Sequence, residues 1–318
     1  MRIALSFILL ASTLICGGAM AQDMKTIRLG TATPGGGFPV YGAAFIVAVQ
    51  AADPMLKIEA INTKGSTENV PMLEAGTLDI ALVQGEVVHE ALSGQALGGG
   101  DRPPARLDIL TAMYPTAGMF VVRADSPYHR IADLKGKPIA LGAKGSGLTL
   151  LARYVLDGLG LDAEKDFTAI TLDKAGDGPA MVLDGRAAAL WGGGNGWPGF
   201  TAVASSKEGA RFIAPDIAEI ARILAKHDFL KPMTAPAGGY PGQTAPIPSV
   251  GSWSFVMVRP DLDAETVYRL ARALHKAEAA KSPQLAETTA ANTLAAMSPS
   301  MTLHPGVARY FKEIGLAK

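Results

Sequence analysis

TATPGGGFPVYG, at residues 31–42, is a glycine-rich turn between two apolar segments. IRLG at 27–30 leads into the turn, and AAFIVAV at 43–49 follows it. This order predicts a strand, a turn and the start of a helix. Glycines let the backbone approach a ligand closely, and the free N–H groups at a helix N-terminus attract negative charge. The same turn could serve only to pack a helix against a sheet, so the remaining segments have to decide.

The composition is that of a large globular protein. The chain has 318 residues, of which 48% are hydrophobic and 18% charged, which is enough for two domains. Lys plus Arg and Asp plus Glu number 29 each, so no basic excess indicates nucleic-acid binding. The five histidines show no metal-ligand spacing, and we expect neither a metal nor a cofactor.

Residues 1–21 have the pattern of a cleavable signal peptide. Arg2 supplies the positive charge, residues 3–15 form the apolar core, and AMA at 19–21 is a small-x-small cleavage site. The apolar core is too short to span a membrane comfortably. A lipoprotein would keep Cys16, the one cysteine, but Ile15 stands where lipoprotein signals have a small residue. We therefore expect a periplasmic protein without disulfide or thiol chemistry.

Strands and helices alternate after the first turn. Strands are predicted at 55–62 and 78–83 around a helix over 66–75, and Gln84 follows the second strand. Ser66 is predicted to cap that helix, which should begin a residue or two later because Pro71 lies within it. Two further strands are predicted at 107–113 and 118–123, separated by Tyr114-Pro115-Thr116.

The same alternation starts again beyond residue 123. GAKGSGLT at 142–149 and GGGNGWP at 192–198 are two more glycine-rich turns, each between a strand and a helix. A strand at 250–258 and three helices between 263 and 316 end the chain. The pattern predicts an α/β protein with mostly parallel sheets, in which ligands bind beyond the C-terminal ends of the strands.

We expect two lobes. The first combines residues 22–124 and 250–318, and the second contains residues 125–249. The chain is expected to cross between them near 123–128 and near 246–252. Two crossings form a hinge, with a cleft between the lobes.

Four segments, taken in order, resemble the TAXI family, the solute-binding proteins of one class of TRAP (tripartite ATP-independent periplasmic) transporters. The segments are residues 33–42, residues 64–69 with the Gly76–Gln84 region, residues 131–149 and residues 239–243. The resemblance covers nearly the whole mature chain. It implies a type II periplasmic binding protein fold with a hinge and an interlobe cleft, a small organic solute such as glutamate, 2-oxoglutarate or a dicarboxylate, and a TRAP-type membrane permease as partner. Residues 184–189 and 192–197 depart from the family pattern, as do Pro34, Phe38 and Pro39, so the solute is expected to differ from the commonest one.

The candidate ligand-binding residues come from the turns and from the strand ends. Helix N-termini at 36–41 and 146–149 each direct backbone N–H groups at the shared cleft. Each candidate also has a structural alternative: a helix cap, a ring in the core or a hydrogen bond within a loop. Lys64, Lys144 and Arg123 are candidate counter-charges. The predicted ligand-binding set is Gly36, Gly37, Phe38, Tyr41, Ser66, Gln84, Ser146, Gly147, Thr149, Asn195, Trp197 and Tyr240.

The leading functional hypothesis is a periplasmic solute-binding protein that captures a small organic anion and delivers it to a TRAP-type transporter. The alternatives are a binding protein for an ABC transporter or a sensor kinase, or an exported enzyme with the same fold. Ser146 has no visible His or Lys partner and G-x-S-x-G is absent, so we expect no enzymatic activity. We further expect a monomer that is not embedded in the membrane.

Overall fold

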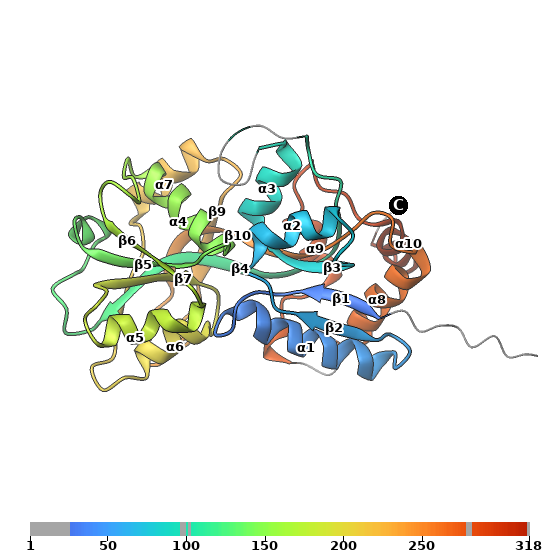
Figure 1. Cartoon of the computed structure of the whole chain (residues 1–318), viewed down its shortest axis with the longest axis horizontal. Coiled ribbons are helices and arrows are strands. Elements are labelled where there is room, and N and C mark those ends of the chain that lie inside the picture. The colour runs from blue at the N-terminus through green and yellow to red at the C-terminus, as the bar shows by residue number, and fades with distance from the viewer. Residues whose placement is uncertain (1–25, 96–99, 101–102, 278–281, 317–318) are drawn as a thin grey trace, which may run out of the picture.

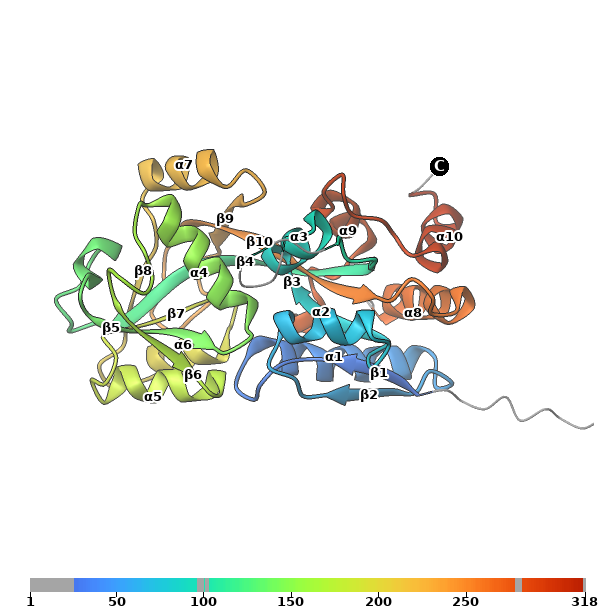
Figure 2. The same ribbon diagram turned by 45° about the horizontal axis from the view of Figure 1, so that its top comes forward.

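The computed structural model describes residues 26–95, 100, 103–277 and 282–316. The predicted signal peptide lies outside the described residues. Two groups of helices and strands lie side by side and are joined by the long strands β4 (Asp108–Arg123) and β10 (Ile247–Val258) (Figures 1 and 2). The expected two-lobed α/β architecture is therefore confirmed.

The first lobe contains the three parallel strands that begin the chain. Strand β1 lies between β2 and β3, and β10 pairs with β3 in the antiparallel direction. The elements of this lobe are β1 (Ile27–Gly30), α1 (Gly37–Ala52), β2 (Ile58–Ile61), α2 (Ser66–Glu74), β3 (Ile80–Gln84), α3 (Gly85–Ser93), α8 (Ala264–Ala277), α9 (Ala290–Ala296) and α10 (Pro305–Glu313).

The second lobe repeats the arrangement. Strand β5 pairs in parallel with β6 and β7, while β7 and β8 pair antiparallel with the second half of β4. The elements of this lobe are β5 (Pro138–Ala143), α4 (Gly147–Gly158), β6 (Thr168–Leu172), α5 (Gly178–Leu183), β7 (Ala189–Gly193), α6 (Pro198–Ala204), β8 (Ala210–Ile213), α7 (Ile217–Lys226) and β9 (Lys231–Ala235).

Strand β4 differs from the sequence-based expectation. Two strands separated by Tyr114-Pro115-Thr116 were expected, but one 16-residue strand runs through that segment. Pro115 lies opposite Trp253, where the register of the β4–β10 pairing shifts. Proline removes a ladder hydrogen bond and is tolerated at such irregular positions, so it does not end the strand here.

The change of strand partners locates the crossing between the lobes. Strand β4 pairs with β10 up to Ala117, and from Gly118 onward it pairs with β7 and β8. This change comes several residues before the expected crossing at 123–128. On the return, β10 pairs with β9 up to Gly251 and with β3 from Ser254. We propose that these two stretches form the hinge.

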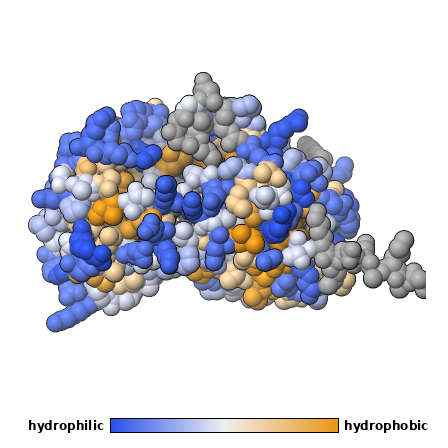
Figure 3. Space-filling view, in the orientation of Figure 1, coloured by the Kyte–Doolittle hydropathy of each residue, from blue (hydrophilic) through white to orange (hydrophobic). Residues whose placement is uncertain are grey.

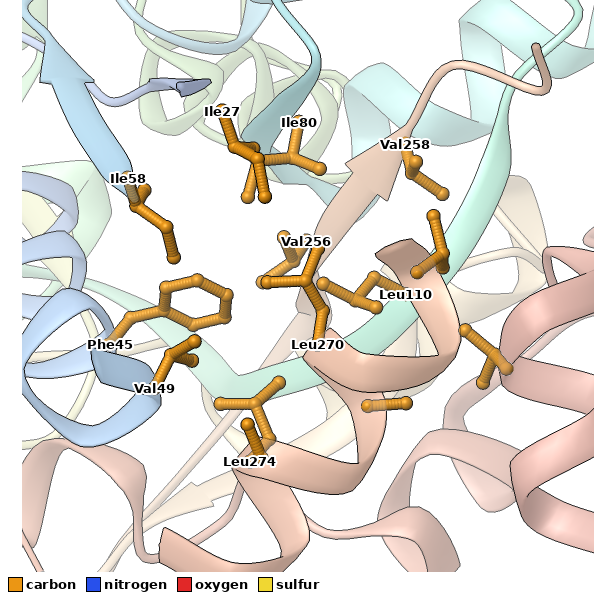
Figure 4. Packing of buried hydrophobic residues seen from close by; sticks show 14 of the residues in the cluster. Ile27, Phe45, Val49, Ile58, Ile80, Leu110, Val256, Val258, Leu270 and Leu274 are labelled. Carbon is orange, nitrogen blue, oxygen red and sulfur yellow. The ribbon is translucent and has the colours of Figure 1, made fainter. Parts of the chain in front are cut away.

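Each lobe has its own apolar core. In the first lobe, Phe45 and Val49 of α1 pack with strand residues and with Leu270 and Leu274 of α8 (Figure 4). The face of α8 that packs in this core is its apolar one, with Val267, Leu270, Ala271 and Leu274. Helix α1 contains no charged residue over its 16 positions and leaves Val40 and Val47 exposed. Apolar surface also shows in the space-filling view around the position of α1 (Figure 3).

Helix α2 corrects a second expectation. It begins at Ser66 rather than after it, and the capping residue is Gly65, at φ = +118°. The Ser66 hydroxyl does not cap the helix but accepts a hydrogen bond from the backbone N–H of Gln84 at 3.0 Å. Pro71 lies inside the helix. Within the described part of the chain, no helix combines the length and the apolar character that a membrane span requires.

Candidate functional site

A cavity lies between the two lobes, where strands β1, β3, β5 and β7 end. Its volume is about 50 Å³, which is room for a few water molecules. Both lobes line it. Eight of the predicted ligand-binding residues are among the lining residues: Gly36, Gly37, Phe38, Ser66, Gln84, Ser146, Gly147 and Trp197.

The lobes touch on both sides of the cavity. On one side the backbone N–H and the hydroxyl of Thr67 donate to the Gly145 carbonyl oxygen at 3.1 and 3.0 Å. On the other side the Ala175 N–H donates to the Thr33 hydroxyl at 3.2 Å, and the Gly176 N–H donates to the Pro34 carbonyl at 3.3 Å. These contacts close the cavity from two directions, so the structure shows a closed arrangement.

Glycine is required where the lobes come closest. A Cβ atom on Gly147 would lie 2.6 Å from the Gln84 Cβ, and one on Gly35 would lie 2.5 Å from the Gly176 Cα. Real Cβ atoms do not approach so closely, so any larger side chain at these positions would hold the lobes apart. The glycine-rich turns of the sequence therefore serve close approach across the cleft.

Three helices begin at the cavity. Their first residues are Gly37 in α1, Ser66 in α2 and Gly147 in α4, and all three residues line the cavity. No side chain caps α1 or α2, whereas the Ser146 hydroxyl accepts from the Leu148 N–H at 3.2 Å and caps α4. Each helix N-terminus carries a partial positive charge, so the three together favour a negatively charged occupant.

Two residues that line the cavity carry a buried side-chain donor without a hydrogen bond of normal geometry. The Gln84 amide Nε2 and the Trp197 indole Nε1 are buried and make no hydrogen bond within the described chain. Trp197 is held in place by its ring, which packs edge-on against Phe200 with 5.0 Å between ring centroids. An unpaired buried donor is unfavourable unless a ligand or water accepts from it. An acceptor in the cavity would satisfy the Trp197 donor, which lies near Gly37. The Gln84 Nε2 lies toward the buried carboxyl of Glu86, whereas the Gln84 Oε1 lies near Gly147.

Tyr114 and Thr116 of β4 also line the cavity, although they were not predicted as site residues. The Tyr114 hydroxyl would lie 3.2 Å from a Cβ on Gly37, which places it against the start of α1. Burial raises the pKa of Tyr114, so its hydroxyl stays protonated and remains able to donate. The signal that could have revealed this pair is a Tyr-x-Thr sequence within an otherwise apolar strand. Further lining residues not in the predicted set include Thr33, Lys64, Leu148, Ala175 and Gly193.

Four predicted residues do not line the cavity. The Tyr41 ring is in the core of the first lobe, and its hydroxyl lies 2.9 Å from that of Thr288. The Thr149 hydroxyl turns back toward strand β5 and donates to the Ala143 carbonyl at 3.3 Å. Asn195 is exposed, and the buried Tyr240 donates its hydroxyl hydrogen to the Gly194 carbonyl. For these residues the structural alternatives to ligand contact account for the side-chain positions.

Of the three candidate counter-charges, Lys64 lines the cavity. Lys144 is exposed, and Arg123 forms an ion pair with Asp125 at 2.7 Å at the far end of β4. None of the described lining residues is an Asp, Glu, His or Cys. In the described part of the chain, no cluster of His, Cys, Asp or Glu side chains is arranged to hold a metal ion.

Two α/β lobes, two crossing strands and a cavity between helix N-termini define the fold of the periplasmic binding proteins. Residues 29–315 match the NMT1-like family, so the chain belongs to the NMT1-like family. The family description does not name the TAXI group, and the membership expected from the sequence stays a prediction.

Comparison with solved structures supports the fold. A structure described as a periplasmic transporter is 16% identical, with a TM-score of 0.56 over 92% of this chain and 94% of that one. A protein from Bordetella bronchiseptica RB50 is 16% identical with the same TM-score, over 92% and 98% of the two chains. The periplasmic binding protein BugD is 13% identical, again with a TM-score of 0.56 over 92% and 98%. At these identities the likeness concerns the fold.

Proposed function

We propose that this protein is a periplasmic solute-binding protein that encloses a small organic anion between its lobes and passes it to a membrane transporter. One observation carries the proposal: the cavity brings together hydrogen-bond donors and positive charge, and no carboxylate is among its described lining residues. The buried indole donor of Trp197, the start of α1, α2 and α4, and Lys64 all favour an acceptor with negative charge.

The donors are divided between the lobes. Gln84, Ser66 and Gly37 belong to the first lobe, whereas Ser146, Gly147 and Trp197 belong to the second. A solute that accepts from both sets stabilises the closed arrangement over the open one, because only closure presents both sets at once. Binding and closure are thus coupled, and the closed form is the one a transporter would recognise.

Small carboxylates fit this chemistry best. A carboxylate accepts several hydrogen bonds at once and carries the charge that the helix N-termini favour. We therefore propose glutamate, 2-oxoglutarate or a related dicarboxylate as the solute class, and a TRAP-type permease as the receiving transporter. The described lining residues include no His, Cys, Asp or Glu that could act as a general base, which favours binding over catalysis.

The first test is a thermal-shift screen of the purified mature protein. We expect the melting temperature to rise with small organic anions, because a ligand that binds only the native state adds about 2.7 kcal/mol of stability at 100 times its Kd. Amides of the same acids are the matched controls, since they keep the shape and lose the charge. Stabilisation by uncharged solutes alone would overturn the anion proposal.

A second prediction concerns the indole N–H of Trp197. Trp197→Phe keeps an aromatic ring and removes the unpaired donor, so we expect the Kd for the anion to rise about tenfold, which corresponds to about 1.4 kcal/mol. Isothermal titration calorimetry would measure it. Trp253→Phe is the matched control, because Trp253 lies in β10 outside the cavity lining. Equal affinities of the two variants would exclude the indole as a ligand contact.

A further inference from the structure

Glu86 is a buried carboxyl group immediately beside the candidate site. It lies in the first turn of α3, two residues after Gln84, and its side chain is fully buried. It does not line the cavity itself. The start of α3 packs tightly on β10, since a Cβ on Gly85 would lie 2.6 Å from the Ser252 hydroxyl and 2.5 Å from the Trp253 carbonyl.

The polar atoms around Glu86 are incompletely paired. Both Glu86 carboxylate oxygens, the Gln84 Nε2 and the Ser254 hydroxyl are buried without a hydrogen bond of normal geometry in the described chain. Ser254 lies opposite Gln84 in the β3–β10 pairing. The side chains of Ser252 and Gln84 lie near enough to lower the pKa of Glu86, although less than burial raises it. These side chains can therefore form more than one set of hydrogen bonds with one another.

In the described part of the chain, no Lys or Arg forms an ion pair with Glu86. The pKa of Glu86 is raised to about 7, chiefly by burial and to a smaller extent by nearby Glu90, and none of the main influences from the described residues is a Lys or Arg. Strand β10 carries no titratable side chain, and near Gln84 and Glu86 it presents the hydroxyls of Ser252 and Ser254. The other titratable groups on the packed helices are Glu90 and His89 on α3, Arg153, Tyr154 and Asp157 on α4, and Glu68 and Glu74 on α2. Tyr154 donates to Glu90 at 2.5 Å, and Arg153 acts on Glu90.

We propose that Glu86 is a positioning residue that must be protonated for the anion to bind, so that the site takes up one proton from solvent together with the anion. This inference rests on the proposed function. In the structure the Gln84 Oε1 lies near Gly147 and its NH₂ group acts on Glu86. A neutral Glu86 would donate its O–H to the Gln84 Oε1, which turns the amide so that the NH₂ group is directed at the cavity. An ionised Glu86 accepts from that NH₂ group instead, which withdraws the donor and places a negative charge beside the anion.

The test is calorimetric titration of the full mature chain at pH 6, 7 and 8. The probe is 2-oxoglutarate or L-glutamate, whichever the screen selects, since the acid groups of both are fully ionised over this range. For the wild type we expect a Kd about tenfold larger at pH 8 than at pH 6, with proton uptake approaching one per site at pH 8. Buffers with different ionisation enthalpies measure that uptake directly.

Two variants test whether Glu86 is the group that takes up the proton. Glu86→Gln is permanently neutral and keeps the shape, so we expect its Kd to be the same at pH 6 and pH 8 and its binding to take up no proton. Glu90→Gln, one turn further along α3, is expected to keep a pH dependence that is shifted to lower pH, because Glu90 raises the pKa of Glu86. The proposal would be overturned if the Kd of Glu86→Gln still depended on pH, or if the Kd of Glu90→Gln did not.

The proposed solute class and the proposed role of Glu86 can be tested independently. If neither probe binds at any pH, the proposed solute class is wrong, and urea denaturation then tests Glu86 alone. A carboxyl group whose pKa is raised in the native state loses its contribution to stability as the pH rises from about 4.5 to about 7. The denaturation midpoint of Glu86→Gln should then exceed that of the wild type by more at pH 8 than at pH 5. Equal differences at the two pH values would show that Glu86 does not titrate as proposed.

Discussion

Gly251→Ala is expected to lower the free energy of unfolding by about 4 kcal/mol or more, which is at the severe end for a single substitution. Gly251 lies in β10 where this strand passes from one lobe to the other, opposite Ala117 of β4. A Cβ on Gly251 would lie 1.7 Å from the Thr116 carbonyl oxygen and 2.9 Å from its carbonyl carbon. The obstacle is backbone of the neighbouring strand, so no side chain can move aside to relieve the overlap.

Gly185→Ala is the matched control for that substitution. Gly185 has φ = +82°, and a Cβ there would meet no atom within 4 Å. The alanine therefore introduces backbone strain alone, and we expect a loss of only about 1 kcal/mol. Urea denaturation followed by circular dichroism would compare the two variants. A loss of similar size in both would mean that β4 and β10 separate easily and are not rigidly paired at the crossing.

The fold could be predicted from the sequence because its signals are local. Glycine-rich turns between apolar strands and amphipathic helices recur in each half, and the structure confirms the alternation at β1–α1, β5–α4 and β7–α6. The length of β4 could not be predicted in this way. Pro115 reads as a break when the strand is considered alone, and only the shifted register opposite Trp253 makes it acceptable.

The candidate site was predictable where it is made of backbone. The turns at Gly36–Gly37 and Ser146–Gly147 both line the cavity, because each follows a parallel strand and such turns lie beyond the C-terminal ends of the strands. Side chains on helices and strands were less predictable. Whether Tyr41 or Tyr114 reaches the cavity depends on the direction of each side chain: the hydroxyl of Tyr41 lies against Thr288 in the core, whereas Tyr114 lines the cavity.

Gly147→Ala is expected to weaken anion binding by about 10- to 100-fold while leaving the unliganded protein folded. Gly147 is the first residue of α4 in the second lobe, and its φ is not positive, so alanine is acceptable to the helix itself. The added Cβ would lie 2.6 Å from the Gln84 Cβ and 3.0 Å from the Ser66 hydroxyl, both in the first lobe. The overlap therefore exists only when the lobes are closed, and overpacking of this kind costs about 1–3 kcal/mol.

Gly136→Ala is the matched control, because it should lower stability slightly without weakening anion binding. Gly136 is in the second lobe at φ = +71°, and a Cβ there would meet no atom within 4 Å, so we expect about 1 kcal/mol lower stability and an unchanged Kd. Calorimetry would give the affinities, and small-angle X-ray scattering with saturating anion would show whether the Gly147→Ala lobes stay further apart. Normal affinity and a compact complex in Gly147→Ala would mean that the solute is held without the contact between Gly147 and Gln84, and that closure does not depend on the glycine-rich turns.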